Sequence, residues 1–368
     1  MKKGILGLGV IFIILAGYLY WNKNVDFLNP KGTNPSALRV SPLDKGAFIK
    51  VMGFLPTWNV GKTIEYTDEI SHLIFLGIEV DANGNLIWDY QAKKMKSEIF
   101  LKQKQLIWEN GGKNILGIKL FEDEKIDKLM ASNEAQDNLI KQLTELFRTQ
   151  KFDGVNVDFE YMGSPTAVLS EEIATFMTRL KNENFGEISL DVFVNTVIRG
   201  EKESLIKMIE AMDYLIIMAY DFHRPGVDYA GPVAPVGAPV GERSILELVE
   251  NIQNLGLDKN KIVLAYPLYG YEWKTYGSEF GAAVKRGWSA LASYKRMATF
   301  AKATAAKWDE ESMTPWVTFK ESGVIHQIYF ENLESISRKI ELAKNNQIGG
   351  IGFWALGYEG ENSEVWDF

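Results

Sequence analysis

Eight short apolar segments alternate with amphipathic stretches, and this alternation restricts the possible folds more than any other feature of the chain. Each segment is a nearly continuous apolar run, as expected for parallel strands that are buried on both faces. The predicted strands are residues 49–55, 72–80, 114–121, 154–160, 188–194, 214–220, 261–267 and 350–354.

Amphipathic helices are predicted between several of these strands. Four apolar residues fall at i, i+3, i+4 and i+7 in residues 173–180 and again in 245–252, and a third such face lies in 139–147. Gly256 follows the second face as a C-cap. Alternating strands and helices predict an α/β fold, a (β/α)8 TIM barrel. An open doubly wound sheet is the alternative, but the first strand lacks the Gly-rich turn that such sheets carry.

The connection after the seventh strand is too long for a simple loop. Residues 271–332 are rich in aromatic side chains, and we predict that they form a small α+β insertion within a barrel domain of residues 47–368. These aromatic residues can form either a wall on which sugars stack or the core of the insertion itself.

The first 21 residues predict a membrane anchor helix. Lys2 and Lys3 precede an uncharged apolar run from Gly4 to Trp21, which is nearly long enough to span a bilayer. No small-x-small cleavage site follows, which favours an uncleaved signal anchor over a cleaved signal peptide. Residues 22–46 are predicted to be a linker. We expect a single-pass protein of the cell membrane with an extracytoplasmic domain, or a secreted protein if the signal is cleaved.

The composition excludes several classes of function. The chain has no cysteine, and its three histidines are not spaced as a metal-ligand pair, so we expect no metal and no cofactor. The net charge is -8 and no basic cluster is present, which argues against a nucleic-acid partner. We expect a monomer.

The fourth predicted strand carries polar side chains at every second position. In DGVNVDFE, residues 153–160, the side chains of Asn156, Asp158 and Glu160 share one face, and apolar side chains occupy the other. Burying carboxyl and amide groups is costly, so the pattern indicates a functional site. In a barrel, functional groups gather at the C-terminal ends of the strands. Glu160 would lie at this end, Asp158 one step further into the barrel, and Asn156 below Asp158, which it would support. A buried polar network without chemistry is the alternative.

The proposed site contains further groups at other strand ends. Two neighbouring carboxyl groups cannot both ionise cheaply, so one should hold a proton, which makes Glu160 a candidate general acid. Tyr220 and Asp221 close the sixth strand, and Trp354 closes the eighth, where a large ring can support a sugar.

Together these motifs resemble those of glycoside hydrolase family 18, the chitinase-like hydrolases. That family carries Asp-x-x-Asp-x-Asp-x-Glu on its fourth strand, Met-x-Tyr-Asp on its sixth and a Trp on its eighth. The matching residues are Asp153, Asn156, Asp158 and Glu160, then Met218, Tyr220 and Asp221, then Trp354. The resemblance covers residues 48–368. The DFE variant of the motif and residues 308–342 are similar to bacterial branches of the family that include spore-cortex peptidoglycan hydrolases.

The resemblance implies a retaining hydrolase of β-1,4-linked N-acetylglucosamine glycans, such as peptidoglycan or chitin-like polymers. In this family the 2-acetamido oxygen of the substrate is the nucleophile. Glu160 would be the acid and base, Asp158 would orient the acetamido group, and Tyr220 would hydrogen-bond its oxygen. The expected substrate-binding residues are Asp153, Asn156, Met218, Asp221, Trp354, Trp58 and Tyr269.

Asn156 departs from the family pattern, which has an Asp at this position. An amide can form a hydrogen bond with Asp158 but cannot share a proton with it, so the pH profile or turnover could change. A non-catalytic carbohydrate-binding module on the same fold is the main alternative function, and a structural or signalling scaffold is a third. The presence of Glu160 favours the enzyme, because lectin-like members of the family lack this acid.

Overall fold

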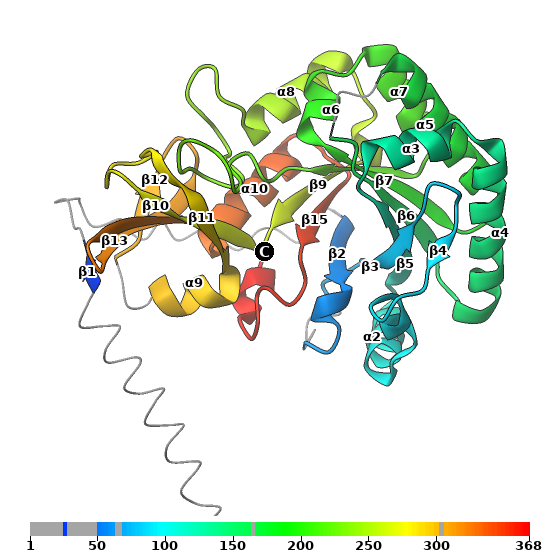
Figure 1. The fold of residues 1–368 in the computed structure, drawn as a ribbon, viewed down its shortest axis with the longest axis horizontal. Helices are drawn as coiled ribbons and strands as arrows, with labels where there is room; N and C mark the ends of the chain where they lie inside the picture. The colour runs from blue at the N-terminus through cyan, green and yellow to red at the C-terminus, as the bar shows by residue number, and fades with distance from the viewer. Residues whose placement is uncertain (1–24, 28–49, 63–67, 163–165, 302–304) are drawn as a thin grey trace, which may run out of the picture.

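The computed structural model describes residues 25–27, 50–62, 68–162, 166–301 and 305–368. Eight parallel strands form a closed barrel (Figure 1), because β2 pairs with β3 as well as with β15. The barrel strands are β2 (Lys50–Pro56), β3 (His72–Val80), β5 (Lys113–Leu120), β6 (Gly154–Phe159), β7 (Glu187–Phe193), β8 (Tyr214–Met218), β9 (Ile262–Pro267) and β15 (Gly350–Trp354). All eight predicted strands are confirmed, and their ends differ by at most two residues from the predicted ones.

Helices surround the barrel (Figure 1) and include the three predicted from their apolar faces. They are α2 (Glu98–Glu109), α3 (Asp123–Met130), α4 (Asn133–Gln150), α5 (Ala167–Asn182), α6 (Val194–Ile198), α7 (Lys202–Glu210), α8 (Ile245–Leu255) and α10 (Leu333–Asn345). Helix α8 ends at Gly256, whose φ of 66° is a left-handed conformation that favours glycine. A two-residue strand, β4 (Leu86–Ile87), pairs antiparallel with β3.

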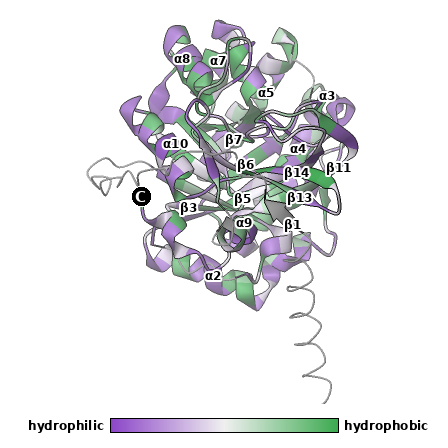
Figure 2. Ribbon diagram, turned by 90° about the vertical axis from the view of Figure 1, so that its left-hand side faces the viewer, coloured by the Kyte–Doolittle hydropathy of each residue, from purple (hydrophilic) through white to green (hydrophobic). Residues whose placement is uncertain are grey.

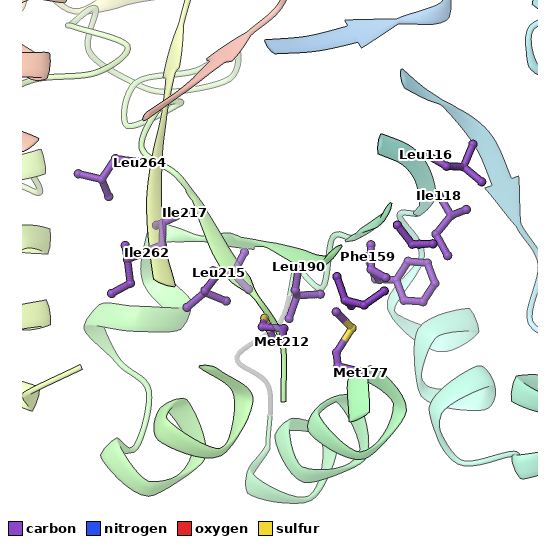
Figure 3. Packing of buried hydrophobic residues seen from close by; sticks show 14 of the residues in the cluster. Leu116, Ile118, Phe159, Met177, Leu190, Met212, Leu215, Ile217, Ile262 and Leu264 are labelled. Carbon is purple, nitrogen blue, oxygen red and sulfur yellow. The ribbon is translucent and has the colours of Figure 1, made fainter. Parts of the chain in front are cut away.

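The core has two apolar layers, one on each face of the barrel sheet. Figure 3 shows side chains of the outer layer, such as Leu190 and Leu215 from the strands and Met177 from α5. Figure 2 shows hydrophobic and hydrophilic residues alternating along the surface helices, as expected for helices with one buried face. The inner layer fills the barrel and consists of Met52, Phe54, Ile74, Ile115, Ile216, Val263 and Ala265.

A polar cluster closes the N-terminal end of the barrel. Its members are the first residues of four strands, His72, Lys113, Glu187 and Tyr214. The Glu187 carboxylate lies 2.8 Å from His72 Nε2 and 2.6 Å from Lys113 Nζ, and it accepts a 3.2 Å hydrogen bond from the Tyr214 hydroxyl. These contacts hold the starts of the four strands together at this end.

The insertion is an antiparallel sheet with one helix, which lies beside the barrel in Figure 1. Its elements are β10 (Tyr269–Thr275), β11 (Val284–Ser293), α9 (Tyr294–Ala301), β12 (Lys307–Asp309), β13 (Thr314–Glu321) and β14 (Val324–Tyr329). The sheet begins two residues before the expected boundary. Six of its aromatic residues lie in its own core, namely Trp273, Phe300, Trp316, Phe319, Tyr329 and Phe330.

The predicted membrane anchor, residues 1–21, lies outside the described residues. Within the described ranges, no helix has the length and apolar character needed to cross a membrane. Most of the predicted linker also lies outside them, but β1 (Val25–Phe27) falls within it and pairs antiparallel with β13. This strand was not predicted from the sequence.

Candidate active site

The C-terminal ends of the barrel strands open into a pocket of about 740 Å³. Strands β6, β7, β8 and β15 contribute to its lining, and so do β10 and β11 of the insertion. Seven of the candidate residues line it, namely Asp158, Glu160, Met218, Tyr220, Asp221, Tyr269 and Trp354. Side chains more than 190 residues apart in the sequence therefore meet at one site.

Glu160 has the environment of a general acid. It follows the last residue of β6, and burial raises its pKa, as does the negative charge of Asp221. Lys119 and Arg224 oppose this shift, but the pKa stays above the usual value of a glutamate side chain. A carboxyl group with a raised pKa retains its proton over more of the neutral range, so Glu160 can donate it to a leaving group.

Asp158 lies deeper than Glu160, and only 3% of it is exposed. Burial raises its pKa well above the usual value, with further contributions from the negative charges of Asp191 and Glu160. The Tyr220 phenol is also buried, which raises its pKa, so it remains a neutral hydrogen-bond donor. The structure thus brings the Asp158 and Glu160 carboxyl groups together with the Tyr220 phenol, three residues that the sequence assigned to one site.

Asp221 is held by two tyrosines from the insertion. The Tyr269 hydroxyl donates a 2.6 Å hydrogen bond to Asp221 Oδ1, and the Tyr271 hydroxyl donates to the same atom at 3.3 Å. Asp221 itself has a φ of 58°, which is uncommon for a residue other than glycine. The insertion therefore positions a carboxylate of the barrel, which gives it a direct part in the site.

Trp354 forms part of the pocket wall at the end of β15. Its ring packs edge to face against Phe54, with centroids 6.0 Å apart, and against Trp58, with centroids 6.2 Å apart. Trp58 is 49% exposed and lies beside the pocket, outside its lining. A held indole ring that faces a polar pocket can stack on a sugar ring.

The comparison with known proteins agrees with this geometry. The model of the glycosyl hydrolases family 18 matches residues 50–359. The chain belongs to glycosyl hydrolase family 18. The predicted resemblance is therefore confirmed, and so is the assignment to the glycoside hydrolases.

Two known proteins and one solved structure illustrate its relation to family 18. It is 26% identical over 265 residues to a probable di-N-acetylchitobiase 1 of Dictyostelium discoideum, which covers 64% of this chain and 69% of that protein. It is 25% identical over 246 residues to a putative sporulation-specific glycosylase, YdhD, of Bacillus subtilis, covering 64% of this chain and 54% of the relative. The chain thus spans about half the length of that relative.

A family 18 chitinase of Cycas revoluta, solved in complex with (GlcNAc)4, has a similar fold. The TM-score is 0.74 at 18% sequence identity, and the match covers 86% of this chain and 97% of that one. At this identity the similarity shows a shared fold.

Asn156, a predicted substrate-binding residue, is fully buried and lies outside the lining of the pocket. Its amide nitrogen donates to Asp191 Oδ1 at 2.9 Å and to Ser189 Oγ at 3.1 Å, and both partners lie on β7. The amide nitrogen therefore links two neighbouring strands, and the expected support of Asp158 stays a prediction. The physical reason is that an amide N–H needs an acceptor, and β7 supplies two.

Asp153, the first residue of the family 18 motif, lies at the opposite end of β6 from Glu160. Seven residues of strand separate the two side chains by roughly 20 Å. The Asp153 carboxylate accepts hydrogen bonds from Trp108 Nε1 at 2.6 Å and from the Asn114 backbone N–H at 2.8 Å. Asp153, a predicted substrate-binding residue, thus joins α2 to the start of β5 and lies outside the lining of the pocket.

Four residues that contact the candidate carboxyl groups or shift their pKa values were not predicted. Asp191 lies on β7, Tyr271 on β10 and Arg224 after β8, and all three line the pocket. Lys119 lies on β5 opposite Asp158. A signal for Asp191 was present, because Ser189 and Asp191 alternate with apolar residues in β7 just as the polar residues do in β6.

Proposed function

We propose that the chain is a retaining hydrolase of β-1,4-linked N-acetylglucosamine glycans that uses substrate-assisted catalysis. The observation that carries this proposal is the half-buried Glu160, with its raised pKa, at the pocket end of β6 beside Asp158. A non-catalytic binding module would not need a carboxyl group held in this protonation state.

The first step uses three side chains of the pocket. A sugar ring that stacks on Trp354 places its 2-acetamido group between Asp158 and Tyr220. The Tyr220 hydroxyl donates to the acetamido oxygen, and Asp158 accepts from the acetamido N–H. Glu160 protonates the glycosidic oxygen while the acetamido oxygen attacks the anomeric carbon, so the glycosidic bond breaks and an oxazolinium ion forms.

The second step reverses the role of Glu160. Its carboxylate takes a proton from a water molecule, which attacks the anomeric carbon and opens the oxazolinium ring. Two displacements at the same carbon retain the anomeric configuration. The negative charge of Asp158 stabilises the cationic intermediate between the two steps.

Among these glycans we favour peptidoglycan or a related glycan of the cell envelope. One relative carries the description of a sporulation-specific glycosylase. The predicted anchor would also place the domain outside the cytoplasm, beside such a substrate. We propose this location on the sequence of residues 1–21, and it is tested by asking whether the protein fractionates with membranes and is cleaved by protease added to intact cells.

The test of function compares the wild-type protein with Glu160→Gln. Both are incubated with acetylated chitooligosaccharides and with peptidoglycan, and the product masses are measured. We expect cleavage by the wild type and a loss of roughly 10²- to 10⁴-fold in turnover for the variant, with binding retained. Glu171→Gln, which changes a surface carboxyl group on α5, is the matched control.

Binding of a glycan without cleavage by the wild type would instead support the binding module. Turnover by Glu160→Gln close to that of the wild type would remove Glu160 from the acid role.

A further inference from the structure

We propose that Asp191, on the fifth barrel strand, is the proton partner of Asp158. It thereby takes over the part that a carboxyl group at position 156 would play in the family 18 motif. Asp191 is a positioning residue that acts through Asp158, and the proposal rests on the function proposed above.

The strand register places the two carboxyl groups side by side. Strands β6 and β7 are parallel, with Asn156 opposite Ser189 and Val157 opposite Leu190. One further step in this register brings Asp158 next to Asp191, on strands that lie about 4.8 Å apart. Both side chains line the pocket and each is only 3% exposed. A buried carboxyl pair at this spacing cannot ionise twice without a large cost.

Asn156 holds Asp191 in this position. Its amide nitrogen donates to Asp191 Oδ1, and a hydrogen bond of this kind favours the ionised form of the acceptor. The other amide atom, Oδ1, can accept a hydrogen bond but cannot take a proton near neutral pH. The amide at position 156 therefore cannot be the proton acceptor for Asp158, whereas Asp191 can.

One oxygen of Asp158 is available for this proton. Among the described residues, the buried Oδ1 of Asp158 has no hydrogen-bond partner. A buried carboxylate oxygen without a donor is costly, and a proton on it, shared with Asp191, removes that cost. The resting pair then carries one proton and one negative charge.

Other charged groups face the pair from the surrounding elements. Lys119 on β5 lies opposite Asp158 and favours its ionised form, while Glu160 at the end of β6 disfavours ionisation of both acids. The Tyr220 phenol, which follows β8, stays neutral. One cation beside three carboxyl groups leaves the pair with a shared proton rather than with two charges.

This shared proton has a place in the reaction. As the oxazolinium ion forms, Asp158 needs a full negative charge, and its proton passes to Asp191. The proton returns when the product leaves. The pair carries one proton and one negative charge before and after each transfer, so no other acid or base is needed.

The first test is Asp191→Ala. Asn156 keeps Ser189 as an acceptor in this variant, so its amide is not left unpaired. The doubly protonated pair loses its first proton at lower pH than a lone buried Asp158 would, because the shared proton stabilises the singly charged pair. Without Asp191 the acidic limb of kcat/KM should therefore move to higher pH. We expect kcat to fall by roughly 10- to 100-fold, the size of effect that is usual when a residue that orients a functional group is removed.

The decisive comparison moves the carboxyl group back to β6. N156D alone places three carboxyl groups together, so it should lower both the unfolding midpoint and turnover. In the double variant N156D/D191A the new carboxyl group can share the proton of Asp158. This variant should regain most of the activity lost in Asp191→Ala, and its acidic limb should return toward the wild-type position.

Two results would overturn the proposal. One is a double variant that is no more active than Asp191→Ala. The other is an N156D substitution that lowers the unfolding midpoint equally in the wild-type and Asp191→Ala backgrounds. The midpoint comparison needs no turnover. If the wild type cleaves none of the tested glycans, the proposed function fails, while the unfolding measurements still decide whether these carboxyl groups interact.

Discussion

At the scale of single residues, DGVNVDFE is one strand with three separate tasks. Asp153 stabilises the N-terminal end, Asn156 joins two strands in the interior, and Asp158 and Glu160 face the pocket. The alternation of side chains along a strand predicts which residues share a face, but not at which depth each lies. The family motif therefore combines residues that differ in their effects on stability and on catalysis.

Replacing Asp153 should affect stability and spare catalysis. Asp153→Ala removes the acceptor of two hydrogen bonds. A hydrogen bond to a charged group contributes about 1.5–3 kcal/mol to the free energy of unfolding. We expect the free energy of unfolding in urea to fall by roughly 2 kcal/mol, with KM and kcat unchanged at a temperature where the variant is folded. A raised KM with unchanged stability would instead return Asp153 to the substrate site.

At the scale of elements, the barrel strands are organised in layers along the barrel axis. Polar residues at the strand starts form the cluster around Glu187 at the N-terminal end. Apolar residues fill the middle, and carboxyl groups occupy the C-terminal end. Each strand contributes to more than one layer. Strand β7 begins with Glu187 and carries Asp191 near its end, so it takes part in stability at one end and in the site at the other.

The polar cluster around Glu187, at the N-terminal end of the barrel, should make a pH-dependent contribution to stability. Burial alone raises the pKa of Glu187, but hydrogen bonds from His72 and Lys113 outweigh it and lower the pKa to about 2. The folded pKa is below the value of 4.5 for a free side chain. The contribution is therefore fully present above pH 4.5 and is lost as the pH falls through about 2. Its size is at most roughly 3 kcal/mol.

Glu187→Gln should thus be less stable than the wild type at pH 7, by roughly 1–3 kcal/mol. Between pH 7 and pH 3.5 this difference should narrow by roughly 1 kcal/mol, as measured by urea unfolding at both pH values. Glu171→Gln breaks an exposed pair with Lys207 and should differ from the wild type by less than about 0.5 kcal/mol at either pH. A difference for Glu187→Gln that is constant with pH would contradict the assigned pKa.

At the scale of the whole molecule, the insertion and the barrel form one site. Tyr269 and Tyr271 of the insertion hold Asp221 of the barrel. Where the chain returns from the insertion, Glu331 and Lys339 form an ion pair of 2.8 Å, with both side chains fully buried. This pair joins the end of the insertion to α10, which packs against β9 and β15.

Replacing one partner of this buried pair should lower the free energy of unfolding more than replacing both partners. Lys339→Met leaves the Glu331 carboxylate buried without its cation, and we expect a loss of about 3–5 kcal/mol in the free energy of unfolding. The double variant K339M/E331L removes both charges and should regain most of that loss, because neither group then needs solvation. Equal instability of the single and double variants, measured by urea unfolding, would show that shape rather than charge dominates here.

The sequence by itself determined the eight strands, the helices around them, the inward face of β6 and the family. These features depend on local periodicity and on motifs, which are visible in a one-dimensional pattern. Only the tertiary structure decided the depth of Asp153, the partners of Asn156 and the presence of Asp191 in the site. Those contacts depend on the register between neighbouring strands, and no single strand carries the information that sets its register against another.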